Sequence, residues 1–446
     1  MSKIVLVGAN HAGTAAANTI LANYPGHELT IVDRNDNISY LGCGTALWIG
    51  RQIDGHQGLF YSSSEELTKK GAIVLMETEV SNVDFAAKKV STVNKHGGKE
   101  TLSYDKLILA TGSLPIIPSL PGMDLENIQS VKLFQDGRKA NELLDDPGVK
   151  TVAIVGAGYI GVELAEAIRR RGKKALLFEA EDTSLASYYD DWLTHDMDRI
   201  LSGEGVELHF NERVKMFKAD KTGKKVSAVV TDKGEYQAEM VIMTIGFRPN
   251  SDIGKGHLDT IANGAFKVNL RQQTSDPDVY AIGDCATVFS NAVQDYAYIA
   301  LATNAVRSGI VAGHNVCGTA LESAGVQGSN GINIFGYKMV STGLSLKAAL
   351  KAGYSALATD YEDLQKPAFM TDNHKVKIRI VYDKDTRRIL GAQMASYENI
   401  SMGIHMFSLA VEEKLTIDKL KLLDIFFLPH FNQPYNYITM AALGAK

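Results

Sequence analysis

The three cysteines are the side chains of this sequence whose type could support covalent redox chemistry. Cys43 lies between two glycines, and a helix is predicted from Thr45 onward, so N–H groups at the helix start would favour the thiolate. No second cysteine is close in sequence. Peroxide would therefore oxidise a Cys43 thiolate to sulfenic acid. The alternative is that Cys43 is a small buried apolar residue, a common role for a lone cysteine.

The other two cysteines fit structural roles better. Cys285 belongs to a Gly-Asp-Cys-Ala turn, and Cys317 follows a helix predicted over 302–315 without flanking charges. No Cys-x-x-Cys pair or Cys/His cluster has the spacing of a zinc site, so no metal is expected. A chain of this size does not need a disulfide scaffold.

A complete G-x-G-x-x-G motif begins at Gly156, between an apolar strand and a predicted helix. Gly156 would make the tight turn, Gly158 would let a pyrophosphate approach the backbone, and Gly161 would let helix and strand pack closely. The next strand ends in Glu179, which would accept a ribose 2′-OH. Residues 180–182, Ala-Glu-Asp, offer no cation for a 2′-phosphate, so NADH is favoured over NADPH. A glycine turn that serves packing alone is the weaker interpretation.

A second, less complete glycine turn lies near the N-terminus. It reads GANHAG over 8–13, with Asn10 where the middle glycine is expected, and the next strand ends in Asp33. Two later segments support a second nucleotide site: LILATGS over 107–113, and a strand over 278–284 that ends in Asp284. An acid at that position can bond the ribityl hydroxyls of a flavin, or it can be a helix N-cap.

These motifs require two βαβ dinucleotide units, because strand, glycine turn, helix and acid-ended strand occur twice. Pro- and Gly-containing stretches at 115–122 and 246–250 mark crossings between domains. We therefore predict an α/β fold with two Rossmann-like dinucleotide-binding domains, for FAD and NAD, and a C-terminal α+β dimerisation domain. The predicted ranges are 1–114 and 247–325 for the FAD-binding domain, 115–246 for the NAD-binding domain, and 326–446 for the C-terminal interface domain.

The C-terminal region has a different pattern from the two βαβ units. Residues 375–382 (KVKIRIVY) alternate polar and apolar side chains and are followed by an Asp-Lys-Asp turn, which predicts an antiparallel hairpin with the strand that starts at Arg388. Amphipathic helices are predicted around 400–414 and 417–423.

Charge and hydropathy exclude several kinds of partner. The formal net charge is −5 and no long basic run occurs, which argues against nucleic acid or an anionic membrane surface as partner. No apolar stretch approaches the ~20 residues of a transmembrane helix. The N-terminus runs directly into the strand-like Ile4–Val7, which leaves no space for a signal peptide, so a cytoplasmic location is expected.

The segment around Cys43 carries a family resemblance. Residues 39–50 read SYLGCGTALWIG, and together with the paired dinucleotide motifs they resemble the flavoprotein pyridine-nucleotide–disulfide oxidoreductases. Two-cysteine members carry a C-x-x-x-x-C disulfide here, and the second cysteine would fall at Trp48. The chain therefore resembles the single-cysteine branch, which contains NADH oxidases, NADH peroxidases and coenzyme A-disulfide reductases. The His11 turn and LGCG…ALWIG are most similar to the water-forming NADH oxidases.

The resemblance implies roles for individual residues. Cys43 would be catalytic, and His11 would lie near it and donate a proton or hydrogen bond. FAD would be bound by Gly8, Asn10, His11, Ala12, Gly13, Asp33, Cys43, Val80, Ala110, Thr111, Gly112, Ser113, Lys132, Asp284 and Ala302. NADH would be bound by Gly156, Gly158, Tyr159, Ile160, Gly161, Glu179, Tyr188 and Gly246. Phe427 would reach the FAD of the partner subunit in a homodimer, although an aromatic cluster there is also typical of an ordinary dimer core.

The implied reaction is the four-electron reduction of O₂ to two water molecules by two NADH, through FAD and a Cys43 thiolate that passes through a sulfenic acid. An NADH peroxidase would use H₂O₂ instead. A coenzyme A-disulfide reductase would need a basic groove, for which Arg51 is the nearest cation. A non-catalytic flavoprotein that senses redox state through NADH is an alternative of a different class.

Overall fold

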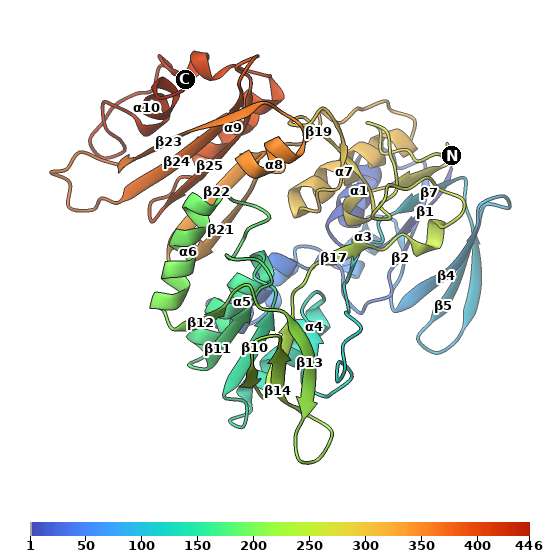
Figure 1. Ribbon diagram of the computed structural model, residues 1–446. Helices are drawn as coiled ribbons and strands as arrows, with labels where there is room; N and C mark the ends of the chain where they lie inside the picture. Colours follow the sequence, from blue (N-terminus) through green and yellow to red (C-terminus); the bar gives the residue numbers. More distant parts are fainter. Residues whose placement is uncertain (1) are drawn as a thin grey trace.

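The computed structural model describes residues 2–446. Two parallel sheets and one antiparallel sheet organise the chain, and Figure 1 shows them as three distinct lobes. This arrangement confirms the predicted α/β fold with two Rossmann-like units and a C-terminal α+β unit. None of the helices in residues 2–446 is both long enough and apolar enough to cross a membrane.

The first parallel sheet is built from segments far apart in the sequence. Its strand order is β18-β7-β1-β2-β3. The strands are β1 (Lys3–Val7), β2 (Glu28–Val32), β3 (Ile73–Leu75), β7 (Lys106–Leu109) and β18 (Val279–Ala281). Helices α1 (His11–Asn23) and α7 (Ala302–Val316) pack tightly together, because Gly309 and Gly313 of α7 leave space for the α1 backbone.

The second parallel sheet has the order β12-β11-β10-β16-β9. Its strands are β9 (Ile128–Ser130), β10 (Thr151–Val155), β11 (Lys174–Phe178), β12 (Val206–His209) and β16 (Met240–Met243). Its helices are α4 (Phe134–Asp145), α5 (Tyr159–Arg170) and α6 (Asp191–Gly203). A three-stranded meander covers one side, formed by β13 (Val214–Ala219), β14 (Val226–Thr231) and β15 (Glu235–Gln237).

The two predicted crossings lie side by side. β8 (Ser113–Pro115) enters the second unit and pairs antiparallel with β17 (Phe247–Pro249), which leaves it. After this return the chain adds β18 to the first sheet, beside β7. Along the chain, the first sheet therefore receives its last strand only after the residues of the second unit.

Short elements complete the first lobe. They comprise η1 (Gly42–Gly44), α2 (Thr45–Ile49), η2 (Gln57–Leu59), α3 (Ser64–Lys69), β4 (Thr78–Asp84), β5 (Lys89–Asn94), β6 (Lys99–Ser103), η3 (Asp252–Gly254), η4 (Gly283–Cys285), β19 (Val288–Ser290) and β20 (Asp295–Ala297). The predicted helix at Thr45 is thus present, although it is only one and a half turns long.

The C-terminal sheet is antiparallel, with the order β21-β22-β25-β24-β23. Its elements are β21 (Asn330–Ile334), β22 (Tyr337–Gly343), α8 (Leu346–Lys351), β23 (Ala356–Leu364), β24 (Lys375–Asp383), β25 (Ile389–Ser396), α9 (Ser401–Glu412), η5 (Ile417–Leu420) and α10 (Tyr437–Leu443). The hairpin predicted at 375–391 is confirmed as β24 and β25.

The helix predicted over 417–423 is wrong in extent. Only the single 3₁₀ turn η5 forms there. Ile417 and Leu420 are buried, and their three-residue spacing matches one 3₁₀ turn. Leu422 is 92% exposed, so no apolar face continues to hold a longer helix against the sheet.

Candidate active site

The two glycine turns have the same geometry. Gly8 and Gly156 adopt φ of +96° and +105°, a region that side chains rarely occupy. A Cβ on Gly13 would meet the Gly8 carbonyl, and a Cβ on Gly161 would meet that of Gly156. The first and third glycines are therefore required by the backbone itself in both units.

The middle position of the motif is different, which explains Asn10. Gly158 has φ of −73° and Asn10 has φ of −84°, both accessible to any residue. Neither residue caps its helix through a side chain, and neither α1 nor α5 has an acid in its first turn. The helix N-termini thus keep their N–H groups and positive dipole end for phosphate.

An acid stands beside each turn. Asp33 accepts a hydrogen bond from the Ala9 N–H at 2.7 Å, and Glu179 accepts one from the Ala157 N–H at 2.7 Å. Burial raises the pKa of Asp33, against the lowering effect of the Asn35 and Ala9 hydrogen bonds. Each carboxylate is thereby held at the end of its strand, where a nucleotide ribose would lie.

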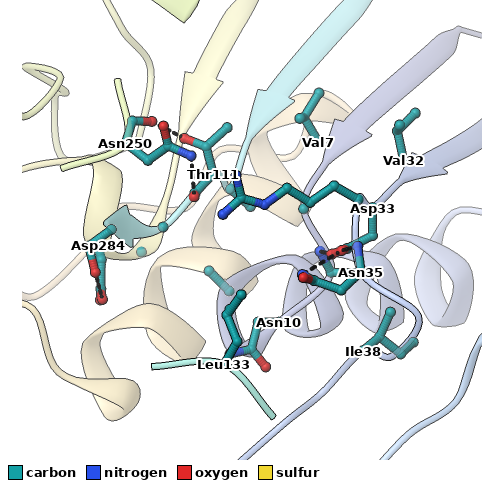
Figure 2. A pocket seen from close by; sticks show the side chains of 18 of the residues that line it. Val7, Asn10, Val32, Asp33, Asn35, Ile38, Thr111, Leu133, Asn250 and Asp284 are labelled. Carbon is teal, nitrogen blue, oxygen red and sulfur yellow. Dashed lines mark hydrogen bonds between the residues drawn. The ribbon is translucent and has the colours of Figure 1, made fainter. Parts of the chain in front are cut away.

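A cavity of about 570 Å³ extends from the first glycine turn across the carboxyl ends of β1 and β7. Figure 2 shows Asp33 and Asp284 in different parts of its wall, with the paired Thr111 and Asn250 near Asp284. The predicted FAD residues that line it are Gly8, Asn10, His11, Ala12, Asp33, Val80, Ala110, Thr111, Gly112, Ser113, Lys132 and Asp284. We call it the flavin cavity because most of the residues predicted to bind FAD line it.

Asp284 and Lys132 are joined through Ser113. The Ser113 hydroxyl donates to Asp284 at 2.8 Å, and Lys132 Nζ donates to the Ser113 oxygen at 2.7 Å. Lys132 Nζ also lies 4.4 Å from the centre of the Phe247 ring. Lys132 is therefore not a free surface charge, and Asp284 lies within the η4 turn rather than at a helix N-cap.

The remaining predicted binding residues lie in other parts of the first two lobes or, for Phe427, in the C-terminal segment. Tyr159 and Tyr188 contact each other edge to face at 4.4 Å, and Tyr188 approaches Gly158. Gly246 has a φ of +108° just before the crossing strand β17. Ala302 begins α7 beside the flavin cavity but is not among the residues that line it, whereas Ala305, one turn later, is. Phe427 is 47% exposed in the C-terminal segment.

Cys43 lies in η1 immediately before α2 and is exposed to solvent on one side. It does not itself line the flavin cavity, but the neighbouring Tyr40 does, and Gly42 approaches the backbone of Lys132, which also lines it. Cys43 is therefore placed beside the cavity wall rather than in it.

The pKa of Cys43 is raised in the structure, whereas the sequence predicts that N–H groups at the helix start lower it. Burial raises the pKa of the thiol, backbone N–H groups of Cys43 and Gly44 lower it, and the Glu163 carboxylate raises it further. The expectation of a lowered pKa is wrong because burial outweighs the backbone N–H groups and because an acid from α5 acts on the same thiol.

Trp48 occupies a position in an aromatic cluster. Its ring stacks on Phe134 at 5.5 Å and 15°, and it contacts His56 at 5.3 Å. Phe134 also contacts Phe60. A large side chain packed on several sides therefore stands where a two-cysteine enzyme would place its second thiol.

Glu163 is a residue that the sequence analysis missed. It lies on α5 and has no hydrogen-bond partner within residues 2–446, and burial, together with the charge of Glu166, raises its pKa to about 7. An acid two residues after the last glycine of a dinucleotide motif is the only signal the sequence offers. Its effect on Cys43 depends on how α5 packs against α2.

Replacing Glu163 with Gln should lower the pKa of Cys43. The substitution removes a negative charge that opposes ionisation of the thiol, and that charge is present above about pH 7, where Cys43 titrates. The pH dependence of iodoacetamide alkylation, measured in a Cys317→Ser background, should shift to lower pH. Glu142→Gln, which removes an exposed acid from α4, should leave the profile in place, and an unchanged profile in Glu163→Gln would contradict the coupling.

One acidic group elsewhere resembles a metal site but already holds a cation. Asp372, His374 and Glu398 have ligand atoms within 4.8 Å of one another. Lys366 Nζ lies 3.3 Å from both carboxylates. The ammonium group therefore neutralises this cluster.

Two glycine-turn dinucleotide units, a thiol beside the first and a separate antiparallel C-terminal sheet define the class of a two-nucleotide oxidoreductase. The chain belongs to the pyridine nucleotide-disulphide oxidoreductase family. The family profile matches residues 2–309, and the family's dimerisation domain matches residues 331–436.

Individual relatives cover the whole chain. It is 58% identical to an NADH oxidase of Lactococcus lactis and 56% identical to an NADH oxidase of Streptococcus pyogenes, each over 100% of both chains. Among solved structures, the water-forming NADH oxidase from Lactobacillus brevis bound to NADH is similar with a TM-score of 0.96. It is 38% identical, and the match covers 99% of this chain and 98% of that one.

Proposed function

We propose that this chain is a water-forming NADH oxidase that catalyses 2 NADH + 2 H⁺ + O₂ → 2 NAD⁺ + 2 H₂O. The observation that carries the proposal is a single accessible cysteine beside the flavin cavity, with Trp48 in place of a second thiol. The similarity to NADH oxidases over the full length supports it. Bound FAD would accept the hydride of NADH and pass two electrons to O₂, which yields H₂O₂.

The two glycine turns would bind the two nucleotides. The turn at Gly8 and the start of α1 would hold the FAD pyrophosphate, with Asp33 on the adenosine ribose. Ser113, Lys132 and Asp284 form a hydrogen-bonded group at the other end of the flavin cavity, where they would bind the ribityl and ring end. The turn at Gly156 and Glu179 would hold NADH in the same way.

Cys43 would remove the peroxide. Because burial raises the pKa of Cys43, the thiol must first lose its proton. The resulting thiolate attacks one oxygen of H₂O₂, the O–O bond breaks, and the departing hydroxide takes a proton to become the first water. Electrons from a second NADH then reduce the Cys43 sulfenic acid back to the thiolate, and its oxygen leaves as the second water. His11 lines the flavin cavity, and burial lowers its pKa, which favours the neutral imidazole. It would donate the hydrogen bond that the departing hydroxide needs.

The stoichiometry of the FAD-loaded enzyme tests this function. An oxygen electrode and an NADH absorbance trace should give two NADH consumed per O₂, with little H₂O₂ in a peroxidase-coupled assay. One NADH per O₂ with stoichiometric H₂O₂ would overturn the proposal. An NADH peroxidase would consume NADH rapidly only after H₂O₂ is added, and a redox sensor would keep its flavin reduced in air with negligible turnover.

A coenzyme A-disulfide reductase fits the structure less well. Such an enzyme needs free cations for the coenzyme A phosphates, and Arg51 was the nearest one in sequence. Arg51 is instead paired with Asp145 at 2.7 Å. The NADH absorbance assay also tests this alternative. NADH oxidation that starts only when coenzyme A disulfide is added would favour the reductase over the oxidase.

We further propose that two copies of the chain form a homodimer through the C-terminal lobe. Large apolar side chains that are more than half exposed gather after η5, namely Phe426 at 66%, Phe431 at 57% and Tyr435 at 74%. Monomers rarely leave such a group open to water. Phe427, on the same segment, would approach the FAD of the partner.

Introducing a charge into this apolar group should weaken the dimer. Phe426→Glu would place a carboxylate in a desolvated contact and remove a buried phenyl ring, at a cost of about 2–4 kcal/mol or roughly 30-fold to 1,000-fold in the dimer Kd. Sedimentation velocity over a concentration series measures this change. Ile117→Glu, at a 59% exposed apolar position on the crossing between lobes, is the control. A wild-type chain that is monomeric at all concentrations would contradict the proposal.

A further inference from the structure

His11 lies in the wall between two cavities. It lines the flavin cavity and also a separate outer pocket of about 420 Å³ between α1 and α7. The outer pocket is bounded by Thr14 and Asn18 of α1, by Ile310 of α7, and by Tyr61. Tyr61 lines only the outer pocket, whereas His11 lines both cavities. His11 therefore separates Tyr61 from the flavin cavity.

Tyr61 and His11 form a defined pair. The Tyr61 hydroxyl lies 2.9 Å from His11 Nδ1, and the two rings are parallel within 2° at a centroid distance of 5.7 Å. Because Nδ1 is engaged by the hydroxyl, Nε2 is the ring nitrogen that remains for a molecule in the flavin cavity.

The backbone holds Tyr61 on the same unit as Cys43. Residues 59–62 pair with residues 39–41: the Leu41 N–H donates to the Leu59 carbonyl at 2.8 Å, and Phe60 bridges to Tyr40. The Ser39 hydroxyl donates to the Ser62 carbonyl at 2.7 Å and accepts from the Ser62 N–H. Cys43 follows two residues after this pairing, so the same paired backbone segments position both the thiol and the Tyr61 phenol.

Burial favours the neutral form of both members of the pair. Burial raises the pKa of Tyr61 to about 12, so the phenol keeps its proton. Burial also lowers the pKa of His11, against the opposing charge of Asp284. A neutral phenol that donates to Nδ1 places the single imidazole proton on Nε2.

We propose that Tyr61 is a positioning residue for His11: its hydroxyl fixes the imidazole proton on Nε2 and relays a proton from water in the outer pocket to Nδ1 when Nε2 gives its proton away. This inference rests on the proposed function for its chemical step. In that step Cys43–S⁻ + H₂O₂ + H⁺ gives Cys43–SOH + H₂O: the S–O bond forms, the O–O bond breaks, and Nε2 gives its proton to the departing hydroxide. As Nε2 gives up its proton, the Tyr61 proton moves to Nδ1, and water in the outer pocket reprotonates the phenolate. The imidazole then carries its proton on Nδ1, and the Nε2–H form returns when Nε2 takes a proton from water in the flavin cavity and Nδ1 releases its own towards the outer pocket.

The tautomer of His11 tests the positioning role directly. Nitrogen-15 NMR of the histidine-labelled, FAD-loaded enzyme, with the His11 signals assigned by their loss in His11→Asn, should show the proton on Nε2. Tyr61→Phe should move a large part of the population to the Nδ1–H form. The matched control is Tyr24→Phe, because Tyr24, just after α1, makes the same kind of bond to His314 Nδ1 of α7 at 2.7 Å. An Nδ1–H form in the wild type, or no change in Tyr61→Phe, overturns the proposal.

A double-mutant cycle tests the consequence for chemistry. Tyr61→Phe should slow consumption of H₂O₂ by the NADH-reduced enzyme about tenfold, a part of what a general acid contributes. In a His11→Asn background the same substitution should have no further effect, since it acts through His11. Equal slowing in both backgrounds overturns the proposal. If Tyr61→Phe changes the tautomer as expected but the wild type consumes no H₂O₂, the proposed function is rejected and the positioning role stands.

Discussion

Replacing Cys43 with Ser should convert the enzyme from a producer of water to a producer of H₂O₂. Serine keeps the size of the side chain but cannot be oxidised to a sulfenic acid, so peroxide formed beside the flavin has no thiolate to reduce it. NADH consumed per O₂ should fall from about two to about one. H₂O₂ released per O₂ should rise from near zero to near one, as these two-electron and four-electron stoichiometries require.

Cys317→Ser is the matched control for this experiment. Cys317 caps the end of α7 and is half-buried, so its loss should leave both ratios unchanged. Cys285 is unsuitable because it is fully buried and its thiol donates to the Leu109 and Ile282 carbonyls. If Cys43→Ser still produces only water, the second pair of electrons reaches oxygen without the thiol.

The sequence predicts the geometry of the two glycine turns well because its requirements are local. Gly8 and Gly156 need a positive φ, and Gly13 and Gly161 have no room for a Cβ, so the residue type reports the backbone directly. Asp33 and Glu179 follow from strand length, since each acid must stand at the carboxyl end of the strand that comes after the helix.

The properties of the thiol could not be predicted in the same way. The pKa of Cys43 depends on burial and on Glu163, which is brought to it by packing between α2 and α5. Tyr61 shows no motif, and its pairing with His11 arises from a loop bonded to residues 39–41. Local sequence gives the chemistry of a side chain, whereas its protonation is set by neighbours distant in the chain.

Choice between NADH and NADPH should depend on the charge at the end of β11. Glu179 is held there by N–H groups of Ala157 and Ala180, at 2.7 and 2.6 Å, and Glu181 and Asp182 next to it are exposed acids. A 2′-phosphate would meet these negative charges without a cation. Like charges in such contact cost several kcal/mol, so the wild type should strongly prefer NADH.

The double substitution Glu179→Ala with Ala180→Arg should reverse this preference. It removes the acid that would accept the 2′-OH and adds a guanidinium that can bind the phosphate through two hydrogen bonds. The ratio of kcat/KM for NADPH to kcat/KM for NADH should rise on the order of 1,000-fold, which corresponds to about 4 kcal/mol. Steady-state rates at fixed O₂ measure the ratio. Glu179→Gln removes the negative charge without adding a cation for the 2′-phosphate. It should therefore weaken the preference for NADH over NADPH without raising the turnover of NADPH. A ratio that the double substitution leaves near the wild-type value would mean that the ribose is bound elsewhere than at the end of β11.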